Sequence, residues 1–217
     1  INLFFKKNMK NNWSNLEAKK YVSFYKAKGI SKDLALRVYT TRLLGRNNEL
    51  VLHGGGNTSV KTSIKDIDGK NYNVLCVKGS GWDMAEIEPE GLPAVKLDPL
   101  LSLKNKKNLS DEDMVAFQKK NLINIKSPNP SVETFLHAFL PFKYVDHTHS
   151  DAIMEVTNRK DGFKFCKKIF GNKVSIVPYV MPGFSLARKI DEVYKKKPNI
   201  NCLILMNHGI FTFANNA

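Results

Sequence analysis

The sequence predicts a three-layer α/β/α domain with a mixed, largely antiparallel central sheet. Three observations predict this fold class. Segments typical of helices and of strands alternate along the 217 residues without a strict period. The stretch DIDGK, residues 66–70, is a hairpin signal and therefore indicates antiparallel pairing. Hydrophobic residues make up 42% and charged residues 25%, which is ordinary for a globular domain with a buried core.

The first expected elements are helices. Residues 14–29, SNLEAKKYVSFYKAKG, form a helix that Gly29 ends, and residues 31–45 form a second helix between Ser31 as N-cap and Gly45. We therefore expect residues 1–30 to be an N-terminal extension with a first helix and residues 31–217 to be the main domain. Residues 50–64 then hold β-branched residues around a glycine cluster, and residues 71–83 form a strand that runs into a second glycine turn.

The second half of the chain continues the alternation. Helices are expected at residues 109–122, where Ser110 is the cap, at residues 130–140, and at residues 184–197 before Pro198. Short apolar strands are expected at residues 174–180 and 201–207. The final NHGIFTFANNA follows a strand that no later element covers, so we expect this chain to be part of a longer protein or to lack a terminal helix.

Composition narrows the setting of the protein. No apolar run approaches the ~20 residues of a membrane span, so we expect no membrane partner. The opening INLFFKKNMKNN has neither a long apolar core nor a small-residue cleavage site, so we expect no signal peptide. The three cysteines, Cys76, Cys166 and Cys202, are scattered without a Cys-x-x-Cys spacing, which favours a reducing cytoplasm.

The net charge of +14 is compatible with a nucleic-acid-binding protein. However, the lysines are spread along the whole chain, Arg is scarce and no nucleic-acid-binding motif appears. Arg usually leads where phosphates or base edges are recognised. We therefore expect no nucleic-acid partner and keep a basic nucleic-acid-binding protein as an alternative. The same positive charge would attract a small phosphorylated substrate.

Two of the five histidines stand one residue apart in YVDHTHSDA, residues 144–152. Residues i and i+2 of a strand face the same side, so an extended segment would aim His147 and His149 at one point. His208 follows the apolar strand 201–207, and strand ends are where α/β sheets usually place their sites. Three neutral imidazoles with an open position suit catalytic Zn²⁺ or a neighbouring divalent ion. Two surface histidines without a function are the alternative interpretation.

A carboxylate is available in PSVETFLHAF, where Glu133 is expected in the first turn of a helix and His137 one turn later. The functional interpretation makes Glu133 a general acid/base beside a metal. The alternative is a solvated Glu–His pair. His137 is either a fourth neighbour of the metal or a histidine that packs and supports the site.

Two glycine turns, HGGGNTSVK and VKGSGWD, place hydroxyl and amide groups beside backbone N–H groups that can converge on an anion. Neither turn matches the Walker loop or the G-x-G-x-x-G pattern, so we expect no nucleotide cofactor in this portion. Each turn alone is more often an ordinary turn. Both together, with the histidines and Glu133, favour a pocket for phosphate and metal.

Taken in order, these segments resemble the class II aldolase/adducin family from about Leu34 onward. GGGNTSV and KGSG are similar to its phosphate loops, PSVETFLH to its acidic helix, and HTH and NHG to its metal-binding histidines. The flanks resemble most closely the N-terminal aldolase domain of bifunctional rhamnulose-1-phosphate aldolase/short-chain dehydrogenase proteins. These flanks are LVLHGGGNTSVK, GLPAVKLDPLL, NPSVETFLHAFLP and VPYVMPGFSLA. Any dehydrogenase domain would lie outside this chain.

The resemblance implies retro-aldol cleavage of a ketose 1-phosphate, such as rhamnulose 1-phosphate, to dihydroxyacetone phosphate and lactaldehyde. It implies a divalent metal, commonly Zn²⁺, on His147, His149 and His208, with Glu133 moving the proton. Tyr179 would lend a proton across a subunit interface of a homotetramer. The residues implied to hold phosphate or substrate oxygens are Gly56, Asn57, Ser59, Lys78, Ser80, Gly81 and Ser131.

Two positions depart from the family pattern. Lys78 and Gly79 stand before Ser80, where the family often has Thr-Pro, and Val132 stands before Glu133, where it often has Ser. We therefore expect Lys78 to replace some of the phosphate contacts. The alternatives are an epimerase or dehydratase of the same fold and a non-enzymatic, adducin-like interaction domain. The retained histidines and Glu133 argue against the interaction domain.

Overall fold

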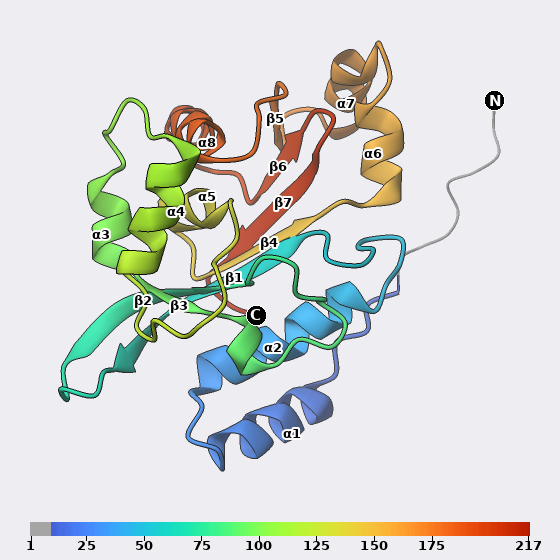
Figure 1. Ribbon diagram of the computed structural model, residues 1–217. Helices are drawn as coiled ribbons and strands as arrows, with labels where there is room; N and C mark the ends of the chain where they lie inside the picture. The colour runs from blue at the N-terminus through green and yellow to red at the C-terminus, as the bar shows by residue number, and fades with distance from the viewer. Residues whose placement is uncertain (1–9) are drawn as a thin grey trace.

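The structure is a computed structural model that describes residues 10–217 (Figure 1). Residues 1–9, which carry most of the segment where we expect no signal peptide, lie outside the described residues. A seven-stranded sheet with the order β3-β2-β1-β4-β7-β6-β5 forms the middle layer. Its neighbouring strands pair antiparallel except β5 and β6, which are parallel. This confirms the predicted mixed, largely antiparallel sheet.

The strands are β1 (Asn57–Lys65), β2 (Asn71–Val77), β3 (Ala94–Lys96), β4 (Tyr144–Thr148), β5 (Ser175–Val177), β6 (Cys202–Leu205) and β7 (Gly209–Ala214). The helices are α1 (Asn15–Lys26), α2 (Lys32–Gly45), α3 (Leu97–Ser102), α4 (Asp111–Lys120), α5 (Thr134–Phe139), α6 (Asp151–Thr157), α7 (Gly162–Phe170) and α8 (Phe184–Lys196), with a 3-10 turn at Pro89–Gly91. None of these helices combines the length and the apolar character that crossing a membrane requires.

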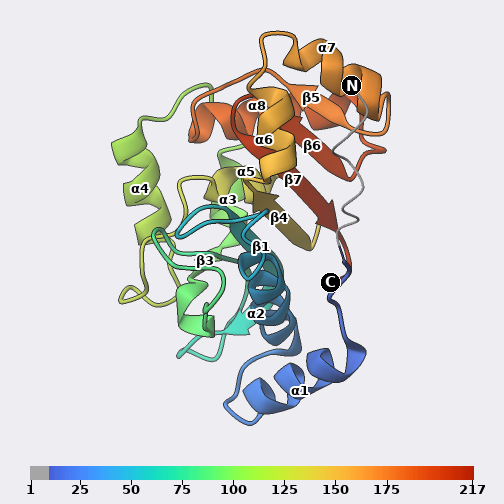
Figure 2. The ribbon, with the colours of Figure 1, turned by 90° about the vertical axis from the view of Figure 1, so that its right-hand side faces the viewer.

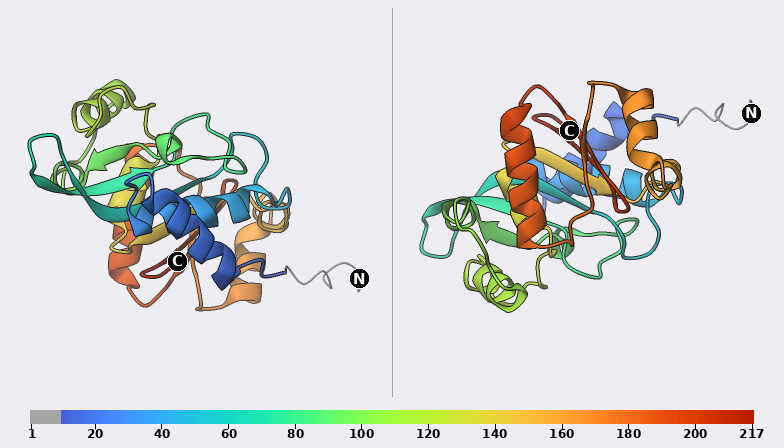
Figure 3. Two further views of the ribbon diagram at one scale, coloured as in Figure 1. Left: turned by 90° about the horizontal axis from the view of Figure 1, so that it is seen from below. Right: turned by 90° about the horizontal axis from the view of Figure 1, so that it is seen from above.

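Helices cover both faces of the sheet, which confirms the three layers. Along β6, Leu203 and Leu205 join the main core with α5 and α8, whereas Ile204 packs with α6 and α7. This alternation follows from the period of two along a strand. Figure 3 shows α8 and α6 on opposite sides of the strands, and Figure 2 shows the α1–α2 pair and the α6–α7 pair at opposite ends of the molecule.

The predicted N-caps are confirmed. Ser31 Oγ accepts from Leu34 N–H at the start of α2, and Ser110 Oγ accepts from Asp113 N–H at the start of α4. These bonds satisfy backbone donors that have no partner within the helix.

Two expected boundaries are wrong. The helix expected at residues 130–140 begins only at Thr134, because Pro130 forms a β-bridge with Gly79 and Ser131 N–H donates to Lys78 C=O. Glu133 is consequently the N-cap residue of α5 and does not lie in its first turn. The strand expected at residues 174–180 ends at Val177, because the next residue is Pro178, which has no N–H for the ladder.

Candidate active site and metal centre

A pocket of about 240 Å³ lies at one edge of the sheet, where β1 and β7 begin and β2 and β4 end. Every predicted site residue lines this pocket except Ser59, His147 and Tyr179. The lining residues are Gly54, Gly55, Gly56, Asn57, Lys78, Gly79, Ser80, Gly81, Ser131, Val132, Glu133, His149, Pro182 and His208. The structure therefore brings together the two glycine turns, the carboxylate and the histidines that lie far apart in the sequence.

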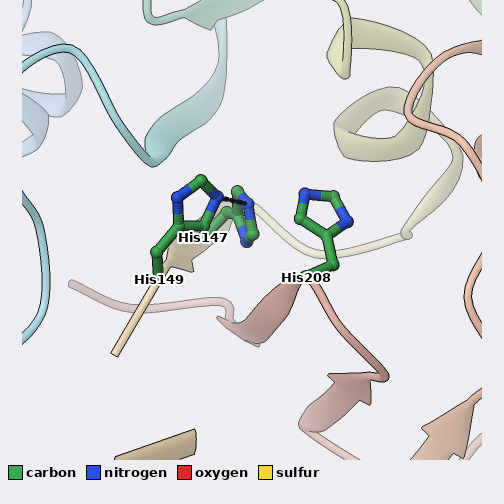
Figure 4. Close-up of side chains that lie close together, drawn as sticks. All are labelled: His147, His149 and His208. Atoms are coloured by element: carbon green, nitrogen blue, oxygen red, sulfur yellow. Dashed lines mark hydrogen bonds between the residues drawn. The ribbon is translucent and has the colours of Figure 1, made fainter. Parts of the chain in front are cut away.

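The three predicted histidines converge, as Figure 4 shows. His147 ends up fully buried in β4, His149 follows that strand, and His208 comes from the turn between β6 and β7. One ligand atom from each side chain lies within 4.8 Å of the others. His147 Nε2 and His149 Nε2 are 3.0 Å apart. Two nitrogens that share one tetrahedral ion at about 2.0–2.1 Å lie roughly 3.4 Å apart, so this spacing is close to that of a shared ion.

The imidazoles are held in the neutral form that a metal requires. Burial, together with the repulsion that a protonated His149 would exert, lowers the pKa of His147 to about 3. Burial also lowers the pKa of His208 to about 4, although the Glu133 carboxylate opposes this. His147 Nδ1 lies 3.1 Å from Ile210 C=O, so it donates there and leaves the Nε2 lone pair for the cluster. The donor set therefore fits a divalent ion such as Zn²⁺.

Two glycines let backbone segments close on the histidine strand. Gly56 has φ +62°, and a Cβ at this position would lie 2.7 Å from His147 C=O. Gly209 has φ +155°, and a Cβ there would lie 2.5 Å from Thr148 C=O. Side chains would push both segments away from β4. The register of β1 on β4 then pairs Asn57 with His147, which brings the first glycine turn to the histidines.

Glu133 lies between the histidines and Asn57 and is only 4% exposed. Its Oε2 accepts from Asn57 Nδ2 at 2.8 Å and lies 3.5 Å from His147 Nε2. Its Oε1 has no hydrogen-bond partner and lies 3.5 Å from His208 Nε2. Burial raises the pKa of Glu133, although His208, the Asn57 hydrogen bond and His149 oppose the shift. The solvated Glu–His pair is therefore not what the structure shows, and a buried carboxyl group with a raised pKa suits a general acid/base.

Lys78 joins the two glycine turns from beneath the pocket. Its Nζ donates to Gly54 C=O at 3.1 Å and to Trp82 C=O at 2.6 Å, and the residue is only 2% exposed. Burial lowers the pKa of Lys78 to about 8, while Asp83 opposes the shift. The second turn also contacts the segment that leads to Glu133, because Ser80 N–H donates to Asn129 C=O. A positive charge thus lies under a cradle of glycines and hydroxyl groups.

Three of the residues singled out in the sequence do not line the pocket. Ser59 is fully buried, and its Oγ lies 2.8 Å from His137 Nδ1. His137 is also fully buried, and it does not belong to the group formed by His147, His149 and His208, so it is not a fourth metal neighbour. Tyr179 is 51% exposed, and its hydroxyl contacts Met181 Sδ at 3.6 Å. The i, i+4 spacing of Glu133 and His137 was the only sequence signal for the role of His137.

The fold and this site define a class of protein, and comparison of the chain with known protein families identifies that class. The family model for the class II aldolase and adducin N-terminal domain matches residues 35–217. The chain therefore belongs to the class II aldolase/adducin family, which confirms the resemblance seen in the sequence.

Individual relatives agree with this family. The chain is 39% identical over 189 residues to "Uncharacterized oxidoreductase YuxG" of Bacillus subtilis (strain 168), and the match covers 87% of this chain and 27% of that protein. The chain therefore spans well under half the length of that relative. The N-terminal class II aldolase domain of a conserved protein from Thermoplasma acidophilum has 39% identity and a TM-score of 0.84, covering 96% of this chain and 91% of that chain. A sugar-phosphate aldolase from Thermotoga maritima shares the fold, with 14% identity, a TM-score of 0.62 and 86% of each chain covered.

Proposed function

We propose that this chain is a metal-dependent lyase that cleaves a ketose 1-phosphate resembling rhamnulose 1-phosphate to dihydroxyacetone phosphate and lactaldehyde. The observation that carries the proposal is the convergence of three neutral imidazoles on a buried carboxyl group, in a pocket walled by two glycine turns. Membership of the class II aldolase/adducin family supports it.

The residues proposed to hold the divalent ion, which we take to be Zn²⁺, are His147, His149 and His208. When bound, the ion supplies a Lewis acid for the carbonyl and hydroxyl oxygens of the substrate. His208 and His149 line the pocket, whereas His147 contacts His149 from behind. This arrangement leaves the substrate side of the cluster open.

Glu133 is proposed to move the proton at carbon. When the C3–C4 bond breaks, the C4 hydroxyl gives its proton to the Glu133 carboxylate as the aldehyde forms, and the bonding electrons remain with C3. C3 must then take up a proton. Glu133 fits this transfer because its Oε1 is free of hydrogen bonds and because burial raises its pKa, which makes the carboxyl group a better proton acceptor.

The two glycine turns are proposed to hold the phosphate group. The contacts are proposed to come from Gly56, Asn57, Ser80, Gly81 and Ser131, all of which line the pocket. Lys78 is proposed to attract the phosphate by its charge, because its Nζ already binds carbonyl groups of both turns. We assign Ser59 a supporting role through His137, in place of the direct contact expected from the sequence.

Tyr179 is proposed to serve the pocket of a neighbouring copy in a homotetramer. In its own chain it lies outside the pocket. Several exposed apolar residues lie in or next to the segments that form the pocket, which supports a subunit interface there. They are Leu52, Val132, Tyr179 and Met181.

The oxidoreductase name of the Bacillus subtilis relative concerns a protein of which this chain matches 27%. We propose that in a protein built like that relative, the oxidoreductase chemistry lies outside the class II aldolase domain. We also propose a reducing cytoplasmic setting, because Cys76, Cys166 and Cys202 are all free.

Release of dihydroxyacetone phosphate from a panel of ketose 1-phosphates that differ at C3 and C4 tests the proposed function. We expect the zinc-loaded protein to cleave at least one member, chelation to abolish the release, and added Zn²⁺ to restore it. Failure of the zinc-loaded protein to cleave any member would contradict the proposal. Interconversion of C4 epimers without release would favour the epimerase alternative.

A further inference from the structure

His137 lies at the centre of a hydrogen-bonded chain that ends on Glu133. Ser59 Oγ lies 2.8 Å from His137 Nδ1, and His137 Nε2 lies 2.5 Å from Asn57 Oδ1. Asn57 Nδ2 in turn donates to Glu133 Oε2 at 2.8 Å. These contacts connect β1, which carries Asn57 and Ser59, with α5, which carries His137 and has Glu133 as its N-cap.

The contacts determine where the hydrogens lie when the ring is neutral. Because Glu133 Oε2 accepts from the Asn57 amide nitrogen, Asn57 must turn its carbonyl oxygen toward His137. His137 must then carry its proton on Nε2 and accept the Ser59 hydroxyl proton at Nδ1. The ring is kept neutral because burial lowers the pKa of His137 well below its ordinary value, and the electrostatic influence of His147, Lys61 and Arg37 adds to this shift.

This arrangement decides which oxygen of Glu133 is free. Oε2 is held by Asn57, whereas Oε1 has no hydrogen-bond partner. Rotating the Asn57 amide by 180° would set its oxygen against Oε2 and would release the carboxyl group. His137 prevents this rotation, because its Nε2–H requires an acceptor on the Asn57 side.

We propose that His137 is a positioning residue that fixes the Asn57 amide and, through it, the carboxyl group of Glu133, so that Oε2 is held and Oε1 is left to exchange the proton. This inference rests on the function proposed for Glu133. Ser59 anchors the far side of the ring. A role in packing alone is the alternative that an experiment must separate, because the ring also packs edge-on against Phe211 with centroids 5.6 Å apart.

The first test replaces His137 by one residue that keeps the packing of the ring and by another that keeps the N–H donor. His137→Phe preserves an aromatic ring without hydrogen bonds, and His137→Gln retains an N–H donor near the position of Nε2. We expect His137→Phe to keep its bound metal and to lose roughly 10–100-fold in kcat with little change in KM, the usual cost of losing a residue that orients a site. His137→Gln is expected to recover most of that loss. Unchanged kcat in folded His137→Phe would overturn the inference, and so would a His137→Gln variant that folds stably and binds metal but shows no recovery.

Two controls separate positioning from packing. Phe135→Leu removes packing from the same helix without touching the hydrogen bonds, so we expect a lower Tm and a kcat close to that of the wild type. In a Glu133→Gln background, His137→Phe should cost little further kcat, because the residue through which it acts has already lost proton transfer. Multiplicative losses in the double variant would mean that His137 acts independently of Glu133.

A last readout needs no substrate. NMR of ¹⁵N-labelled protein distinguishes the two neutral tautomers of His137, and we expect the proton on Nε2. A crystal structure of His137→Phe should show the Asn57 amide released from Glu133. If no ketose phosphate is cleaved but both observations hold, the proposed function fails and the positioning of Glu133 stands. If cleavage occurs with the proton on Nδ1, the proposed function stands and the inference about His137 is overturned.

Discussion

Glu133 shows at the residue scale how position changes an ordinary side chain. In water a glutamate is ionised at neutral pH. In this protein it is almost fully buried, and burial raises its pKa, yet one of its oxygens accepts only from Asn57 and the other has no hydrogen-bond partner. A buried carboxyl group with a raised pKa and a free oxygen can accept and release a proton, which is what a general acid/base must do.

Replacing Glu133 separates proton transfer from metal binding. Glu133→Gln keeps the shape and most hydrogen bonds, so we expect the metal to remain bound by the three imidazoles. Turnover on a cleaved ketose phosphate should fall by roughly 10²–10⁴, the usual range for the loss of a general acid/base. Metal content and kcat are measured on the same preparation. Near wild-type turnover would show that Glu133 is not the acid/base.

Replacing His149 should have the opposite signature. His149 is exposed and belongs to the cluster, so we expect His149→Ala to remain folded but to lose the metal and with it the activity. The loss of metal affinity should exceed the roughly 10–100-fold that removal of a merely supporting residue causes. Titration with Zn²⁺ measures this affinity. Stoichiometric metal in His149→Ala at micromolar concentration would exclude His149 as a ligand.

At the scale of elements, a single lysine of β1 binds the carbonyl groups at the C-terminal end of α5. Lys61 Nζ donates to the carbonyl groups of His137, Leu140 and Phe142 at 2.7, 2.7 and 2.8 Å. These are carbonyl groups at and after the last turn of the helix, where no further helical N–H is available. Burial lowers the pKa of Lys61 to about 7, and the charge of Lys104 contributes.

This pKa predicts how stability changes with pH. Between the folded pKa of about 7 and the unfolded value of about 10.4, the unfolded chain binds more protons at Lys61 than the folded chain. The Lys61 contribution to the free energy of unfolding therefore rises with pH in this range, by at most about 1.4 kcal/mol per pH unit. We expect the stability of the wild type relative to Lys61→Met to be greater at pH 9 than at pH 7 in urea unfolding. A difference independent of pH would show that the three carbonyl groups keep Lys61 charged throughout.

Elements with strong local signals were predicted from the sequence, and those defined by tertiary contacts were not. The capping serines of α2 and α4, Gly45 at the end of α2 and the acidic first turn of α4 are local signals, so both helices were expected. The helices α6 and α7 were missed, because they are short, with 7 and 9 residues, and neither begins with a side-chain cap hydrogen bond. The late start of α5 depends on the pairing of Pro130 with Gly79, which lies 51 residues earlier in the chain and leaves no local mark.

The same division applies to the candidate site. The convergence of the histidines was predictable because His-x-His fixes two side chains on one face and His208 follows a strand. The burial of Ser59 was not predictable, because only the packing of α5 on β1 places His137 over its hydroxyl group. In the sequence, nothing distinguished Ser59 from Ser80, the serine of the other glycine turn.

For the whole molecule, assembly is the main prediction. We expect a homotetramer in which Tyr179 approaches the pocket of a neighbour, because Tyr179, Met181 and Val132 expose apolar surface next to the pocket. Tyr179→Phe should then lower kcat while leaving assembly and metal content unchanged. Light scattering at micromolar concentration measures the assembly. A fully active monomer would refute both the tetramer and the role of Tyr179.

The most direct measurement of the proposed metal centre is anomalous diffraction at the zinc edge from crystals grown with Zn²⁺. We expect one strong peak per chain, within about 2.0–2.2 Å of an imidazole nitrogen from each of His147, His149 and His208 and next to the open side of the pocket. A crystal in excess Zn²⁺ with no peak among these three histidines, or with its only peaks elsewhere on the surface, would contradict the metal-dependent function.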